Sequence, residues 1–176
     1  MHYMQAHGYT TGPTQRPTAA GLISAAIASV GAWAIIDATR AIDQAEQNLG
    51  ITWNTAISVY FLLCLLGGVF YGRIFQRTVN DRHGGWLFGI AYGFLLWMIG
   101  PVAIAQWALY TPIVSGSAAA GVLAANLAYG LTLGVTYPWI HHLIQRRLYD
   151  VFREVQKNRP VFLEAPKQLH VHRAPA

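Results

Sequence analysis

GGWLFGIAYGFLLWMIGPVAIAQWALYTPIVSGSAAAGVLAANLAYGLTLGVTYPWIHHLIQ, from Gly84 to Gln145, contains no Asp, Glu, Lys or Arg. One membrane crossing needs about 20 mostly apolar residues, so this stretch is long enough for two crossings and a turn. Basic residues close it at both ends, Arg82 on one side and Arg146 on the other. A buried helix of a soluble protein seldom stays uncharged beyond about 14 residues, so the stretch predicts a membrane hairpin whose ends share one face of the bilayer.

The composition of the whole chain agrees with a membrane protein. Hydrophobic residues make up 54% and charged residues 11% of the 176 residues, against about 25% charged in soluble domains. The net charge of +5 comes from basic residues that flank apolar spans, as cytoplasmic loops do, so we expect lipid as a partner and no nucleic acid. The single cysteine, Cys64, falls within a span and is expected to pack as a small apolar side chain.

The expected fold is an all-α integral membrane bundle of four transmembrane helices. The predicted spans are about 19–36, 53–75, 86–107 and 118–143. A cleaved signal peptide is the rival interpretation of the first span, but we find no small-x-small cleavage site there. The front half of the connection after it is expected to extend that helix, until Asn48-Leu49-Gly50 ends it.

The fourth span is expected to lead into an amphipathic cytoplasmic helix over residues 144–159. Apolar residues recur there at steps of three and four, charged residues take the other faces, and Pro160 ends the pattern. This helix either continues the span or lies along the membrane surface. The segments at the two ends, 1–18 and 160–176, are expected to be disordered tails.

Basic residues predict the orientation. With four spans both termini share one side, and that side carries every Lys and Arg except Arg40. Because positive residues near spans resist translocation, both termini are expected to be cytoplasmic.

Small residues spaced four apart recur along the spans and are expected to pack helices together. In lipid, helices adhere through close backbone approach, which small side chains permit. These contacts either hold the bundle itself together or leave one stripe for another membrane subunit or a second copy. The predicted packing glycines are Gly68, Gly72, Gly89, Gly93, Gly130 and Gly134.

Polar groups within the spans are few. Asn126, Gln106 and Tyr129 form a candidate polar path, with carbonyls freed near Pro101. Because no Asp, Glu, Lys or Arg lies deep in a span, an ion-coupled transporter is disfavoured.

Histidines at the cytoplasmic ends raise the question of a cofactor. His83 and His142 lie at similar depth and would be the ligands of a haem or another cofactor. His141 and His142 point about 100° apart on a helix, so one site would use only one of them. The ordinary interpretation is interfacial histidines, and we expect no bound metal or cofactor.

A faint repeat relates the second and fourth spans. Gly68-Val69-Phe70-Tyr71 is matched by Gly134-Val135-Thr136-Tyr137, which suggests two parallel hairpins that arose by duplication, although chance explains it equally simply.

The segment from Gly85 to Ile140 resembles a group of small uncharacterised bacterial inner-membrane proteins. The resembling residues are Gly85-Trp86-Leu87-Phe88-Gly89, Tyr92-Gly93, Trp97, Gly100-Pro101, Tyr129-Gly130, Gly134 and Tyr137. The resemblance implies a four-span protein of the bacterial inner membrane and assigns no reaction.

The chain lacks a catalytic triad, paired carboxylates and a phosphate-binding loop, so we expect no enzyme. The preferred function is a non-enzymatic accessory, structural or assembly subunit of a membrane complex. The alternatives are a small oligomeric transporter or channel, or a cofactor-binding membrane subunit.

Overall fold

The computed structural model describes residues 16–75, 85–100, 107, 110 and 113–157, and every regular element in them is a helix. The helices are α2 (Pro17–Ala38), α3 (Ala41–Leu49), α4 (Trp53–Ile74), α5 (Gly85–Trp97) and α7 (Gly116–Lys157). Three of them, α2, α4 and α7, are long and apolar enough to cross a membrane, and the apolar helix that begins at Gly85 is shorter. Most of both expected tails and part of the expected third span lie outside the described residues.

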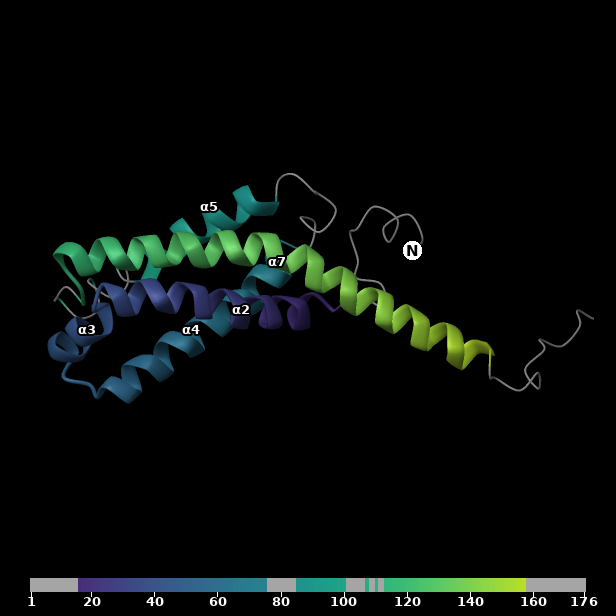
Figure 1. The fold of residues 1–176 in the computed structure, drawn as a ribbon, viewed down its shortest axis with the longest axis horizontal. Helices are drawn as coiled ribbons and strands as arrows, with labels where there is room; N and C mark the ends of the chain where they lie inside the picture. The colour runs from purple at the N-terminus through teal and green to yellow at the C-terminus, as the bar shows by residue number, and fades with distance from the viewer. Residues whose placement is uncertain (1–15, 76–84, 101–106, 108–109, 111–112, 158–176) are drawn as a thin grey trace, which may run out of the picture.

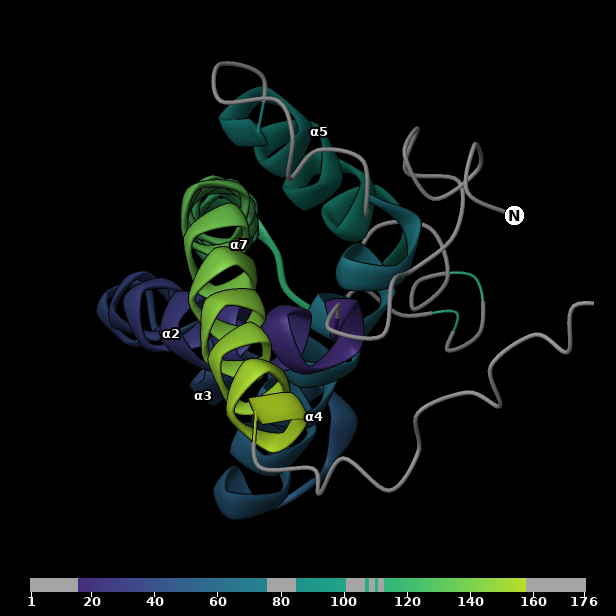
Figure 2. The same cartoon turned by 90° about the vertical axis from the view of Figure 1, so that its right-hand side faces the viewer.

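Helix α7 is the long axis of the fold, as Figure 1 shows. Helices α2 and α5 both pack along it, and α4 packs on α2. Seen end-on in Figure 2, α5 lies on one side of α7, and α2 and α4 lie on the other. Helix α5 runs antiparallel to α7, because Gly85 faces Gly134 while Gly93 faces Asn126.

The contact between α2 and α4 is made by glycine and alanine. A Cβ added to Gly21 would collide with the backbone of Gly68 and crowd that of Gly72, and one added to Gly68 would collide with Ala25. The buried face of α2 is made almost entirely of small residues: Ala20, Gly21, Ser24, Ala25, Ala28, Ser29 and Ala32. The two backbones therefore touch directly, which is how helices adhere in lipid.

The contact between α5 and α7 uses the same device. Gly89 and Gly93 of α5 face Gly130 and Gly134 of α7, and a Cβ on any of the four would meet the backbone of the partner helix. All six packing glycines expected from the sequence therefore lie at contacts inside the bundle, two against α2 and four between α5 and α7.

The connection after α2 differs from the expected extension of that helix. Thr39 turns its hydroxyl onto the Ile35 carbonyl at 2.9 Å, and Arg40 takes a left-handed conformation with φ of 51°. The chain therefore turns and starts α3, a separate helix that ends as expected at Gly50, also left-handed with φ of 63°. The break lies at Arg40, because its left-handed conformation cannot continue an α-helix.

Helix α3 is bonded to the segment that leads into α7. The Gln44 amide donates to Ser115 Oγ at 3.0 Å and accepts from the Ser115 backbone N–H at 2.8 Å. Asn48 donates to the Ile113 carbonyl at 2.9 Å. These three bonds tie the connection between α2 and α4 to the start of α7.

Helix α7 is one continuous helix of 42 residues with Pro138 inside it. At about 1.5 Å per residue it is about 63 Å long, roughly twice the thickness of a hydrocarbon core. Pro138 cannot bond the carbonyl four residues earlier, and that carbonyl, of Gly134, faces Gly85 of α5. The expected fourth span and the amphipathic segment are thus parts of one helix, whose end projects past the bundle (Figure 1).

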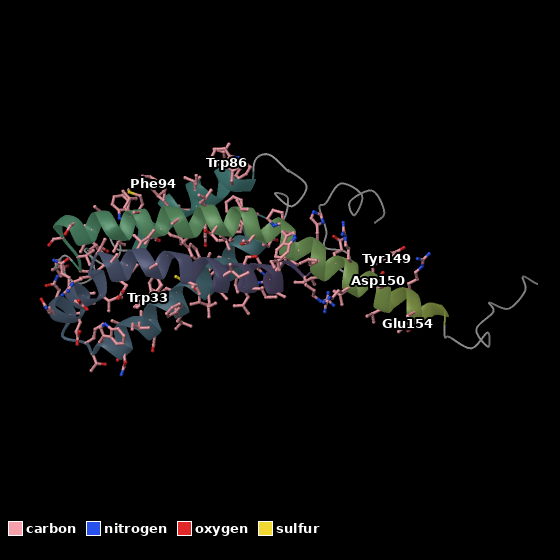
Figure 3. The ribbon with its side chains drawn as sticks, viewed as in Figure 1. Trp33, Trp86, Phe94, Tyr149, Asp150 and Glu154 are labelled. Carbon is pink, nitrogen blue, oxygen red and sulfur yellow. The ribbon has the colours of Figure 1, made fainter. Side chains whose placement is uncertain are left out.

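Large apolar side chains cover the outside of the bundle. Leu63 is 61%, Phe70 60%, Leu87 55% and Val135 58% exposed. Figure 3 shows Trp86 and Phe94 on the outer surface of α5. Such an apolar exterior, with helices that meet through alanine and glycine, is typical of a bundle that faces lipid.

Candidate functional site

Four tyrosines form a seam between α4 and the pair α5 and α7. We call Tyr71, Tyr92, Tyr129 and Tyr137 the tyrosine seam; all four are at most 5% exposed. Their hydroxyls donate to backbone carbonyls of other helices. Tyr129 bonds Cys64 at 2.5 Å, Tyr92 bonds Gly67 at 2.6 Å, Tyr137 bonds Gly72 at 3.0 Å and Tyr71 lies 3.5 Å from the Gly85 carbonyl.

The seam fills the space that the small residues of α4 leave. Tyr71 stacks edge-on against Tyr92 at 5.2 Å and against Tyr137 at 5.4 Å between ring centroids. Phe75 closes one end, 4.8 Å from Tyr71. Edge-to-face pairs at these distances are attractive. Because the rings of Tyr71, Tyr92 and Tyr137 are in contact and the hydroxyls of all four tyrosines reach carbonyls of other helices, the seam holds α4 to α5 and α7.

The two halves of the faint repeat meet in this seam. Tyr71 and Tyr137 occupy the same position in the matched segments, and their rings are in direct contact. Gly68 faces α2 in one pair and Gly134 faces α5 in the other, through backbone contacts of the same kind. The helix contacts are not symmetric, however, because α2 packs along α7 whereas α4 makes no comparable contact along α5, so the duplication stays a hypothesis.

The described members of the candidate polar path, Asn126 and Tyr129, donate to carbonyl groups of the bundle. The Asn126 amide donates to the Val122 carbonyl of its own helix at 2.8 Å, and the Asn126 backbone carbonyl faces Gly93. Tyr129 is 2% exposed and bonded to α4. Gln106 lies outside the described residues. The side-chain N–H of Asn126 and the hydroxyl of Tyr129 are thus bonded within the bundle, and the polar path stays a prediction.

The structure distinguishes the two adjacent histidines of α7, His141 and His142, by their burial. His142 is exposed, and His83 lies outside the described residues, so their pairing as cofactor ligands stays a prediction. His141 is instead the buried one, 5% exposed, with its Nδ1 unpartnered and its ring 6.0 Å from that of Tyr137. The sequence signal for its burial is its place one turn after Tyr137 on the same helix face.

Within the described residues, no group of three or more His, Cys, Asp or Glu is placed to hold a metal ion. Cys64 is a half-buried thiol whose backbone carbonyl accepts from Tyr129. The tyrosine seam satisfies hydroxyl donors inside an apolar bundle, and it joins α4, α5 and α7.

No family model, curated protein or solved structure matches the chain. The resemblance over Gly85 to Ile140 therefore stays a prediction.

Proposed function

We propose that this chain is a non-enzymatic accessory, structural or assembly subunit of a membrane complex. In this proposal it has four membrane spans, with α5 as the start of the third, and lies in the bacterial inner membrane with both termini cytoplasmic. The side that carries Arg16, Arg73, Arg146 and Arg147 faces the cytoplasm, since positive residues resist translocation.

The observation that carries the proposal is a difference between two parts of the chain, the closely packed bundle and the exposed end of α7. The close-packing glycines are used between helices of the same chain, so they leave little for a partner within the membrane. The end of α7, by contrast, projects beyond the bundle with Val151 57% and Val155 54% exposed. An apolar surface held away from its own bundle favours contact with another protein.

The test is purification from the native membrane in a mild detergent or native nanodiscs. We expect a co-purifying partner at fixed stoichiometry that is lost when the chain is cut after Gln145, while the helical content of the bundle is retained. A protein that purifies alone from native membranes, before and after the cut, would contradict the proposal.

The topology has its own test. Reporters that are active on only one side of the membrane, fused at either terminus, are expected to report the same cytoplasmic side. Opposite sides would remove the four-span arrangement.

One observation favours a transporter or channel as the second candidate. Helix α5 ends at Trp97 in a π-helical turn over residues 98–100, just before Pro101. Broken helices of this kind free carbonyls that line ion or substrate sites in transporters. Solute flux into proteoliposomes that is abolished by Asn126→Leu would favour this candidate over the first.

A further inference from the structure

The projecting end of α7 carries an apolar stripe, which we define as Ile144, Leu148, Val151 and Val155. Val151 and Val155 are 57% and 54% exposed, and Leu148 is half-buried. Ile144, at the base of the stripe, packs against the buried core of the bundle. The steps of four, three and four place all four residues within about 60° of one another on a helix.

This stripe continues the face of α7 that is already covered inside the bundle. At about 100° per residue it lines up with Leu133 and Tyr137, both 0% exposed. Tyr137 reaches Gly72 near the end of α4, and Gly72 lies against Pro17 at the start of α2. The stripe therefore overhangs the end of the bundle where α2 begins and α4 ends.

This position disfavours a second copy of the chain as the occupant. A second copy in the same membrane is related to the first by an axis along the membrane normal, so its α7 would run parallel and meet the stripe with its own. The bundle directly below the stripe is filled by α2 and α4 of the first copy, and the second α7 would have to pass through them.

The charges disfavour lipid. A helix that lies on an anionic bilayer has its basic residues beside the apolar stripe, where they reach the headgroups. Here Arg146 and Arg153 fall about 160–180° from Tyr137, on the opposite side of α7 from the stripe, and of these three arginines Arg147 alone lies beside it. Moreover, α7 continues without a break from the bundle to Lys157, which directs its end away from the membrane plane.

Resting on the proposed function, we propose that the stripe docks an acidic amphipathic helix of a water-soluble protein. The apolar residues of the partner helix would cover the stripe, just as helices of the bundle cover the same face of α7 at Leu133 and Tyr137. Its acidic residues would meet Arg147, which flanks the base of the stripe. Glu154 flanks the stripe near its tip, so the acidic residues of the partner belong near the base.

The experiment uses the full chain in nanodiscs and a defined probe. The probe is a synthetic helix of about 21 residues with leucine at the a and d positions and glutamate beside them. One comparison peptide has the same composition in scrambled order, and another has lysine in place of glutamate. In a Cys64→Ser background, Val151→Cys carries an environment-sensitive dye, and Tyr149→Cys, on the far side of α7, carries the same dye as the matched control.

We expect the glutamate helix to shift the emission of the dye at position 151 to the blue and to leave position 149 nearly unchanged. Its affinity is expected to exceed that of either comparison peptide by about tenfold or more, and to fall by a similar factor on Arg147→Glu. In unlabelled protein, Val151→Ser with Val155→Ser should weaken binding, whereas Tyr149→Ser should not.

Three results would each overturn the inference. One is equal binding of the ordered and scrambled peptides, or none of either. Another is quenching of the dye at position 151 by headgroup-quenching lipids without peptide, which would assign the stripe to the membrane. The third is a disulfide-linked dimer through Val151→Cys in native membranes, which would assign it to a second copy. If a native partner still co-purifies in an α7-dependent way, the proposed function survives the loss of this inference.

Discussion

Replacing Gly130 with alanine tests whether α5 and α7 are held by direct backbone contact. The added Cβ would lie 2.8 Å from the Gly93 nitrogen and 2.9 Å from the Gly93 Cα, and it would collide with the Gly89 carbonyl. Ordinary contacts of a Cβ begin at 3.4 Å, so α5 must move by at least 0.6 Å, the difference between 3.4 and 2.8 Å. The atoms in the way are backbone, and no rotamer change relieves them.

Gly31→Ala is the matched control, because a Cβ there meets nothing within 4 Å. Both variants place alanine in the interior of a helix, so the intrinsic preference for alanine, about 1 kcal/mol, cancels between them. Overpacking typically costs about 1–3 kcal/mol. We therefore expect Gly130→Ala to have a free energy of unfolding about 2 kcal/mol lower than that of Gly31→Ala.

The assay is reversible unfolding in mixed micelles of a mild detergent and dodecyl sulfate, followed by helical circular dichroism. The two variants are compared at the same micelle composition, so that the detergent reference is shared. Equal unfolding free energies for Gly130→Ala and Gly31→Ala would refute the reasoning that glycine contacts hold this pair of helices.

Three further predictions use the same measurement. Tyr129→Phe and Tyr137→Phe each remove one hydroxyl bond to α4 and should each lower the free energy of unfolding by about 0.6 kcal/mol and at most about 1.7 kcal/mol. Tyr110→Phe, at a residue that is 90% exposed, should leave the free energy of unfolding unchanged. An equal loss at all three positions would contradict the stabilising role of the tyrosine seam. Gln44→Ala removes two bonds to Ser115 and should cost about 1–2 kcal/mol, whereas Gln47→Ala, at an exposed position of the same helix, should be neutral. Gly50→Ala forces a side chain into a left-handed conformation without any clash and should cost about 1 kcal/mol, so a neutral result would deny that turn.

The helices themselves were predictable because their signals are local. A charge-free run needs no knowledge of its neighbours, and the limits of α2 and α4 fall within two residues of the predicted spans. The spacing of glycines likewise predicted that helices would touch through Gly68 or Gly130. It did not predict which helix each glycine would meet, because that depends on how the helices are arranged in space.

The features that sequence reasoning missed depend on long-range partners or rare conformations. Nothing in the sequence around Arg40 requires a positive φ, which belongs to glycine far more often than to arginine. The bond between Gln44 and Ser115 joins residues 71 positions apart. The burial of His141 in preference to its neighbour follows from the direction in which α7 faces the bundle, and that direction becomes visible only when Tyr137 is seen inside it.

Helix α7 is continuous from Gly116 to Lys157, so a displacement of one end is transmitted along it. Thr39 contacts α7 at Gly121, near one end, and Gly89 and Gly93 of α5 contact it near its middle. A displacement of the helix beyond Gln145 would therefore be carried to its beginning, where Gln44 bonds Ser115.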